Sequence, residues 1–169
     1  MKKKLLLTTI ILSLILFLLP TQFVSAASID SNINSSKIIA IEYLDDGSYL
    51  VTELYENDND DIALLSTVKA ANKVVTRYSS SGEALCALKL TATFSYDGST
   101  VSCVGTTHTE YSYDDAWSVE DVTTSHSSSS TSKASATGNC NFVKRFLGIT
   151  TNRISASTTI YCDVNGNLS

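Results

Sequence analysis

Proline is almost absent from this chain of 169 residues, and its one occurrence, Pro20, lies near the N-terminus. Histidine occurs twice, and tryptophan and methionine occur once each. The sequence contains no G-x-S-x-G elbow, no H-E-x-x-H motif and no glycine-rich phosphate loop. The usual sequence support for hydrolases, zinc proteases and nucleotide-binding enzymes is therefore missing. We expect no catalytic residue, no cofactor and no bound metal.

The N-terminal residues 1–26 have the three parts of a secretory signal peptide. Lysines occupy positions 2–4, and the following fifteen residues are apolar except for two threonines and a serine. Val24 and Ala26 then provide small residues at the positions that a signal peptidase recognises. We expect cleavage after Ala26 and secretion of residues 27–169 to an extracellular, oxidising environment, in which cysteines form disulfides.

Positive charge is scarce after this segment. Three of the 12 Lys and Arg residues lie in residues 1–26, which leaves 9 basic against 17 acidic residues and a formal net charge of −8. Nucleic acids and anionic membranes are bound mainly through Lys and Arg, so we expect neither as a partner. No second apolar run reaches the length of a membrane span. The sequence favours a freely secreted monomer whose partner is an extracellular protein or glycan, over an uncleaved, anchored form.

Glycine is infrequent, but four of the seven glycines stand in dipeptides that are typical of tight turns. No helical period of apolar residues follows the signal segment. The turns therefore predict a succession of antiparallel strands. The four dipeptides are Asp46-Gly47, Ser81-Gly82, Asp97-Gly98 and Asn165-Gly166.

Apolar and polar residues alternate with period two between these turns. In residues 84–94, Leu88 and its next-but-one neighbours are apolar, whereas Lys89, Thr91 and Thr93 on the other side are polar. Residues 134–142 and 154–164 repeat the pattern. Such alternation is typical of strands with one buried and one solvated face. We predict an all-β fold, namely an Ig-like antiparallel β-sandwich.

The chain is predicted to contain a hairpin before its main core. A two-residue turn at Asp46-Gly47 would place Ile41 opposite Thr52. The simplest interpretation is that this hairpin completes the sandwich. Two alternatives are an edge strand that joins a partner's sheet and a pro-segment that is removed. The predicted segments are a signal peptide (1–26), a flexible N-terminus (27–37), the hairpin with its acidic connector (38–66) and the sandwich core (67–169).

The four cysteines allow three disulfide pairings. A two-residue turn at Asp97-Gly98 would place Cys103 opposite Ala92, six residues or roughly 20 Å along the strand from Cys86. A disulfide needs Cα atoms within about 7 Å, so these two cysteines are too far apart. A parallel argument separates Cys140 from Cys162. The remaining possibilities are Cys86–Cys140 with Cys103–Cys162, or Cys86–Cys162 with Cys103–Cys140.

Four segments together resemble a group of small secreted proteins of unknown function from Gram-positive, Clostridia-type bacteria. They are IEYLDDGSYLVTE (41–53), GEALCALKLTATFSYDGSTVSC (82–103), KASATG (133–138) and TIYCDVNGNLS (159–169). The resemblance implies a disulfide that corresponds to Cys103–Cys162, which leaves Cys86–Cys140 as an additional bridge. It implies no catalytic residues.

Aromatic residues are the candidate ligand-binding groups. Trp117, the only tryptophan, lies near Tyr111 and Tyr113, and an exposed cluster of these rings would stack on a sugar or a peptide. A sandwich often buries a single tryptophan, and the sequence favours that position for Trp117. The tyrosines of the predicted hairpin form a second candidate patch. They are Tyr43, Tyr49 and Tyr55.

Residues with catalytic or metal-binding chemistry are present but lack a recognisable pattern. His108 and His126 lie in Thr- and Ser-rich stretches and are predicted to be ordinary surface residues. The acidic run 58–61 lacks the glycine and distal glutamate of a calcium loop, and we expect solvated charge both there and in the second acidic run, 114–121. The favoured function is a non-enzymatic extracellular interaction module. The alternatives are a secreted effector or toxin processed from a precursor, and a small secreted hydrolase that uses one of the histidines.

Overall fold

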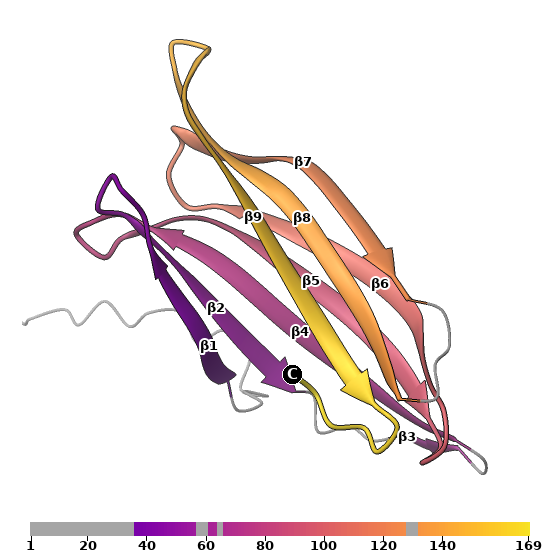
Figure 1. The fold of residues 1–169 in the computed structure, drawn as a ribbon. Coiled ribbons are helices and arrows are strands. Elements are labelled where there is room, and N and C mark those ends of the chain that lie inside the picture. Colours follow the sequence, from indigo (N-terminus) through magenta and orange to yellow (C-terminus); the bar gives the residue numbers. More distant parts are fainter. Residues whose placement is uncertain (1–35, 57–60, 64–65, 128–131) are drawn as a thin grey trace, which may run out of the picture. The chain divides into compact units, whose positions relative to one another are not determined.

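The computed structural model describes residues 36–56, 61–63, 66–127 and 132–169. Within these residues nine strands form two antiparallel sheets, and the smaller sheet covers one face of the larger (Figure 1). The strands are β1 (Ser36–Tyr43), β2 (Tyr49–Glu56), β3 (Asp61–Ala63), β4 (Ser66–Tyr78), β5 (Ala84–Tyr96), β6 (Val101–Ser112), β7 (Trp117–His126), β8 (Lys133–Phe146) and β9 (Ile149–Asp163).

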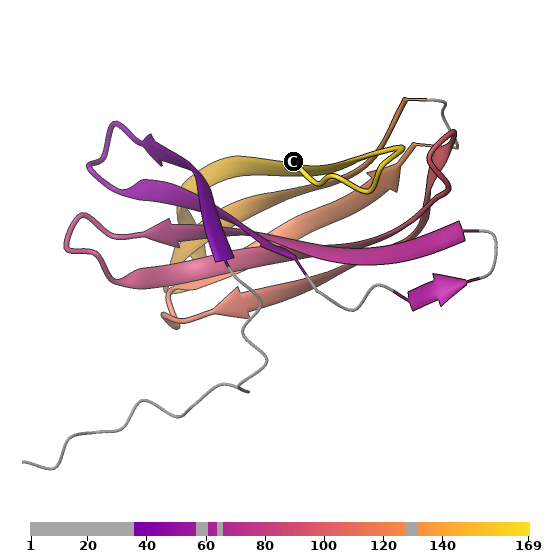
Figure 2. The ribbon, with the colours of Figure 1, turned by 90° about the horizontal axis from the view of Figure 1, so that it is seen from below.

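Most neighbouring strands within each sheet are also consecutive in sequence, except that β2 pairs with β4. The larger sheet has the order β1-β2-β4-β5-β6, with β3 paired to β4, and the smaller has the order β7-β8-β9. The strands of both sheets run along the same general direction (Figure 2). The predicted all-β, two-sheet fold is confirmed. The finer prediction of an immunoglobulin-like strand order is not confirmed, because most neighbouring strands follow one another in sequence, whereas an immunoglobulin domain has Greek-key connections.

The predicted alternation decides which side chains enter the core. Every second residue of β5 from Cys86 to Phe94 is completely buried between the sheets. The corresponding positions of β8 and β9 also face inward, with Ala136, Phe142 and Ile160 fully buried. Each large apolar side chain removed from water contributes about 1.5–3 kcal/mol, so this inner face supplies the main stabilising free energy.

The two sheets approach each other closely at Gly138 in β8. A Cβ atom built there would lie 3.3 Å from Cδ1 of Leu90 and 3.6 Å from Cδ2 of Leu88. Glycine therefore makes room for two leucines of the opposite sheet. On either side of this contact the core divides into two clusters, one containing Phe94 and Ile160 and the other containing Trp117 and Phe142.

The register of the β1–β2 hairpin differs from the predicted one by one residue. Ile41 lies opposite Val51, not Thr52. The loop is longer than two residues because the Leu44 N–H donates to the Ser48 carbonyl (2.9 Å) and the Asp46 carboxylate accepts the Ser48 N–H (3.0 Å). A one-residue shift reverses the face of every side chain, so Ile41 faces outward and all of β1 is exposed.

The β5–β6 register also differs from prediction. Cys103 lies opposite Phe94, not Ala92. The Asp97 carboxylate accepts the backbone N–H groups of Ser99 and Thr100, at 2.8 and 2.6 Å, and this cap widens the turn. The conclusion that Cys86 and Cys103 are remote along the hairpin is unaffected.

The β8–β9 hairpin closes with a two-residue turn. Leu147 and Gly148 both have positive φ, at 48° and 80°, as such a turn requires. In the other hairpin of this sheet, β7 ends at His126 and β8 begins at Lys133. Residues 128–131 between them and the predicted connector residues 57–60 lie outside the described residues.

Two of the motifs that carried the family resemblance lie against each other. The Gly98 N–H donates to the Val164 carbonyl (2.9 Å), which joins the β5–β6 turn to the C-terminal turn. Gly166 lies on the ring of Tyr96, where an added Cβ would come 2.6 Å from Oη. The Asp163 carboxylate closes the C-terminal turn by accepting the N–H of Asn167 (2.9 Å).

Candidate functional site

The outer face of the larger sheet gathers six of the eight tyrosines. Outward orientation follows from the register: Tyr49 pairs with Tyr78, and the next pair along, Leu50 and Arg77, faces the core. The same argument turns Tyr111 outward, because the neighbouring Cys86–Ser112 pair faces inward. We call this surface the tyrosine face. Its members are Tyr43, Tyr49, Tyr55, Tyr78, Tyr111 and Tyr113.

Five of the six rings of the tyrosine face contact another ring of the same face. Tyr49 and Tyr78 are stacked with centroids 5.2 Å apart, and Tyr43 adds a tilted contact to Tyr49 at 5.8 Å. Tyr111 and Tyr113 are stacked at 6.1 Å. Aromatic pairs in this distance range stabilise each other beyond their buried area. The ring contacts therefore restrain the orientations of these side chains in two groups, one of three tyrosines and one of two.

The electrostatics of Tyr55 link the two groups of rings. Burial, followed by the like charge and hydrogen-bond acceptor of the neighbouring Glu53, raises the pKa of Tyr55 to about 12. Smaller contributions to the same pKa come from Tyr78 and Tyr113, so these phenols lie within electrostatic range of one another. The pKa values of Tyr78 and Tyr113 are raised as well, first by burial.

Much of this aromatic surface is open. Tyr43 is 77% exposed and Tyr113 is 56% exposed. Beneath the rings, Thr76 and Ala87 point to the same outer face and are nevertheless buried, which we attribute to the tyrosine rings above them. The tyrosine face thus has buried residues beneath the rings and exposed ring surface above them. Sequence reasoning identified five of the six tyrosines but missed Tyr78, because its position depends on the pairing of β4 with β2.

Trp117 does not belong to this surface. It begins β7 in the smaller sheet, is 6% exposed and belongs to the core cluster that includes Cys86 and Phe142. The guanidinium carbon of Arg77, from the opposite sheet, lies 4.2 Å from its ring centroid. The three aromatic residues that the sequence grouped together are therefore separated, with Tyr111 and Tyr113 outside and Trp117 between the sheets.

Arg77 itself is a buried charge with incomplete hydrogen bonding. Its Nη2 donates to the Asp46 carboxylate (2.7 Å) and to the Ser48 hydroxyl (3.0 Å). Among the described residues, Nε and Nη1 find no hydrogen-bond acceptor. Burial lowers the pKa of Arg77 and Asp46 partly offsets this. The Trp117 ring face supplies the remaining electrostatic support.

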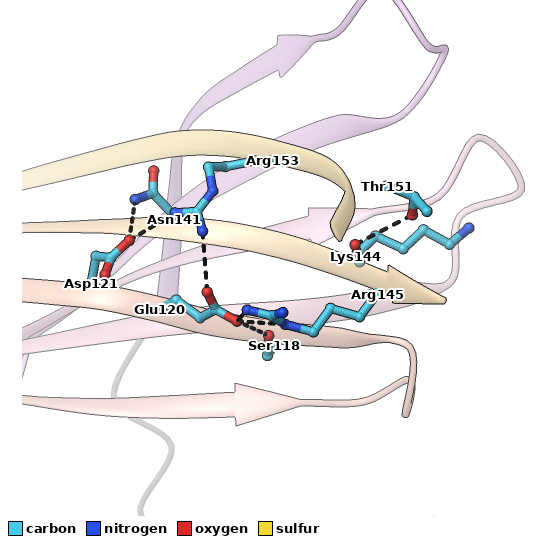
Figure 3. A network of polar contacts seen from close by, with 8 residues as sticks. All are labelled: Ser118, Glu120, Asp121, Asn141, Lys144, Arg145, Thr151 and Arg153. Atoms are coloured by element: carbon cyan, nitrogen blue, oxygen red, sulfur yellow. Dashed lines mark hydrogen bonds and ion pairs between the residues drawn. The ribbon is translucent and has the colours of Figure 1, made fainter. Parts of the chain in front are cut away.

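A second candidate surface is polar and lies on the outer face of the smaller sheet (Figure 3). Glu120 accepts two hydrogen bonds from Arg145, at 2.7 and 3.0 Å, and forms an ion pair with Arg153. Asp121 accepts hydrogen bonds from Arg153 (2.7 Å) and Asn141 (2.9 Å). The two carboxylates and two guanidinium groups neutralise each other.

A hollow of about 300 Å³ adjoins this ion-pair network. It lies where Asp121 adopts a positive φ of 53° and β7 slips in register against β8. Four of its seven lining residues carry an amide or hydroxyl group, and none is aromatic. The lining residues are Asp121, Asn139, Cys140, Asn141, Ser155, Ala156 and Ser157.

The acidic groups of this surface are unsuited to donating a proton. Hydrogen bonds from Arg145 hold the pKa of Glu120 below its usual value. Hydrogen bonds from Asn141 and Arg153 do the same for the pKa of Asp121. A glycosidase needs one carboxyl group with a raised pKa to act as an acid, and this pair has the opposite electrostatics.

The remaining predicted functional groups are dispersed. His108 lies in β6 at 3.7 Å from Glu110, and His126 ends the exposed part of β7. Asp114 closes the β6–β7 turn by accepting the Ala116 N–H (2.8 Å). Within the described ranges, no group of three or more His, Cys, Asp or Glu side chains is arranged to hold a metal ion.

The four cysteines are buried and unbonded in the structure. Cys86 and Cys140 belong to one core cluster, and Cys103 and Cys162 belong to the other. Burial raises the pKa of the Cys86 and Cys140 thiols to about 12 and of the Cys162 thiol to about 11. Reduced thiols with such values are poor nucleophiles at neutral pH.

No family model, curated protein or solved structure matches this chain. The resemblance to small secreted Clostridia-type proteins therefore stays a prediction that rests on the sequence motifs. Among the described residues, no helix has the length and apolar character needed to cross a bilayer.

Proposed function

We propose that this protein is a secreted, non-enzymatic interaction module and that the tyrosine face is its binding surface. The observation that carries the proposal is the convergence of six tyrosines on one face, with rings that contact each other and remain partly exposed. Tyrosine is enriched at protein interfaces because a rigid, amphipathic ring provides contact area at low entropic cost.

The chemistry of the tyrosine face favours a protein as its partner. Ile38 and Ile41 extend the surface with exposed apolar area, which sugars do not bury well. Glycan sites usually surround the sugar with convergent polar groups. The polar hollow near Asp121 has such groups, but it lies on the other sheet and lacks an aromatic ring. A glycan ligand is therefore the alternative outcome of the test below.

The test measures retention of the labelled protein on bacterial cells, on protease-treated cells, and on peptidoglycan and mucin glycans. We expect saturable retention that protease treatment abolishes. Replacing Tyr43 or Tyr113 by alanine should weaken retention about tenfold or more, as for a central interface aromatic. Tyr161→Ala is the matched control, because Tyr161 is 38% exposed but lies on the outer face of the smaller sheet.

The possible outcomes distinguish the class of ligand, the location of the site and whether the protein is a binding module. Protease-resistant retention on glycans with the same tyrosine dependence would replace the protein partner by a glycan. Equal loss in the Tyr161 variant would remove the tyrosine face as the site. No retention on any surface would reject the binding module. The effector alternative has less support, because removing residues 27–66 would take Leu50 and Leu54 out of the core.

We also propose that the secreted protein contains the disulfides Cys86–Cys140 and Cys103–Cys162. The support is that each pair shares a core cluster and an electrostatic interaction, whereas the alternative pairings cross from one cluster to the other. Each bridge would join the two sheets and contribute about 2–4 kcal/mol.

Peptide mapping of the non-reduced protein tests this pairing. We expect two linked peptides with the stated partners and none of the crossed kind. The double variant Cys86→Ser, Cys140→Ser should leave the Cys103–Cys162 peptide intact and lower the melting temperature. Crossed peptides, or four free thiols in protein recovered from an oxidising compartment, would reject the proposal.

A further inference from the structure

Among the described elements, the edge strand β1 is paired on one side only, with β2. All eight of its residues are exposed, and among the described elements its extensive contacts are with β2 alone. It contains no proline and carries three isoleucines. Natural proteins usually cover or interrupt an edge of this length, because its free backbone groups pair readily with another strand. We therefore expect another strand to pair with this edge.

The two charges of β1 are related by the symmetry of an antiparallel self-pair. Lys37 lies opposite Leu54 and Glu42 lies opposite Leu50, and both leucines face the core. Cross-strand neighbours share a face, so Lys37 and Glu42 are on the same side of the sheet. In an antiparallel pair centred between Ile39 and Ala40, each lysine is opposite the glutamate of the other copy.

A bulge makes this register possible. Lys37 and Glu42 are five residues apart, and in a regular strand an odd separation puts side chains on opposite faces. The register of β1 against β2 shifts between Ile38 and Ala40, which inserts one extra residue at Ile39. The shift returns both charges to one face. It likewise puts Ile38 and Ile41 together on the outer face.

We propose that two copies of this chain associate through β1, paired antiparallel with itself so that Lys37 of each copy lies opposite Glu42 of the other. The pairing closes with two-fold symmetry, so it produces a dimer and not a fibre. It also places Ile38 of one copy opposite Ile41 of the other, which joins the apolar margins of the two tyrosine faces. The dimer does not depend on the proposed partner, since Tyr78, Tyr111 and Tyr113 take no part in it.

A charge-swap series tests the dimer by sedimentation of the purified protein at increasing concentration. We expect a reversible monomer–dimer equilibrium with a dissociation constant below about 1 mM. Lys37→Glu or Glu42→Lys alone would set like charges opposite each other twice, which should weaken the dimer about tenfold. The double variant, Lys37→Glu with Glu42→Lys, restores both attractions and should regain wild-type affinity. Unchanged melting temperatures show that the variants remain folded.

Cross-linking tests the register of the proposed β1–β1 pair independently. Mixed chains carrying Ile38→Cys and Ile41→Cys should form an interchain disulfide on mild oxidation. Either variant alone places its two new cysteines three residues apart along the pair, roughly 10 Å and beyond disulfide reach, so it is the matched control. A protein that stays monomeric, singles that dimerise as well as the wild type, or equal cross-linking in the controls would overturn the proposal.

Discussion

The guanidinium group of Arg77 lies against the face of Trp117 inside the sandwich, 4.2 Å from the ring centroid, and the arginine side chain is 1% exposed. Arg77 comes from the larger sheet and Trp117 from the smaller, so the contact joins the two layers. The charge is balanced by Asp46 in the β1–β2 turn, which also accepts a hydrogen bond from Asn152 of the smaller sheet (3.3 Å). A buried cation thus depends on one partly exposed carboxylate.

We expect Asp46→Asn to destabilise the protein by about 1–2 kcal/mol, because it leaves Arg77 buried without its counter-charge. The figure is at the low end for a buried ion pair, since the Asp46 side chain is 42% exposed and water screens it. Urea unfolding followed by Trp117 fluorescence measures the change. Asp45→Asn is the control from the same turn and should stay within about 0.5 kcal/mol of the wild type. Equal effects of the two substitutions would show that Asp46 does not balance Arg77.

We expect Gly166→Ala to be far more destabilising than Gly98→Ala. Both glycines have φ of +83°, which costs a residue with a Cβ about 1–2 kcal/mol. The Cβ meets nothing within 4 Å at Gly98, whereas at Gly166 it enters the ring of Tyr96. Thermal unfolding of the two variants separates backbone strain from this collision. Adding Tyr96→Leu should recover part of the stability of Gly166→Ala and none of that of Gly98→Ala.

We expect stability to fall as the pH rises from about 10 to about 12. The folded protein keeps Tyr55, Tyr78 and Tyr113 neutral at pH values where the unfolded chain, with tyrosine pKa near 10, is already ionised. Raised pKa values of this kind give stability that is complete below the unfolded pKa and is lost through the folded one. Tyrosinate absorbance and urea midpoints at several pH values measure both effects. Tyr55→Phe should flatten the stability profile, and a single tyrosine titration near pH 10 in the folded protein would contradict this account.

We expect a second loss of stability as the pH falls below about 4. Hydrogen bonds from Asn167 lower the pKa of Asp163, and hydrogen bonds from Thr100 and Ser99 lower that of Asp97. Lowered pKa values give stability that is present above the unfolded pKa and disappears as the carboxylates are protonated. Asp163→Asn should therefore be less stable than the wild type at pH 7 and approach it near pH 2. A constant difference across this range would show that charge is not the cause.

Sequencing the N-terminus of the released protein tests the predicted secretion and cleavage. Expression of the full chain in a secreting host should release a protein whose first residue is Ala27, because Ala26 ends the predicted cleavage site. Substituting Ala26 by a bulky charged residue should block this cleavage and retain the precursor in the cell. An intact N-terminus on released protein would contradict the predicted signal peptide.

The inward faces of β5, β8 and β9 were predictable because alternation is a local property. Leu88, Leu90 and Ile160 point inward as their period-two pattern indicated. The registers of β1–β2 and β5–β6 were not predictable from the turn dipeptides. Asp46 and Asp97 accept backbone hydrogen bonds that lengthen both loops, and the geometry of Asp46 depends further on Arg77, thirty-one positions away.

The sequence also indicated which residue types matter without showing where they meet. It grouped Trp117 with Tyr111 because they are close in the chain, yet the sheets separate them. Tyr78 was overlooked because only the pairing of β4 with β2 brings it onto Tyr49. The sequence indicated that aromatic residues form a surface, but it did not show which of them lie together on it.

The sequence by itself determined the all-β fold, the inward faces of β5, β8 and β9 and the positions of the glycine turns, since each depends on residues that are neighbours along the chain. Only the tertiary structure decided the registers, the grouping of cysteines between the sheets and the convergence of six tyrosines on one face. Those relations join distant segments. A one-residue change in a loop reverses a whole strand, so they are fixed by side-chain caps and sheet packing and not by local pattern.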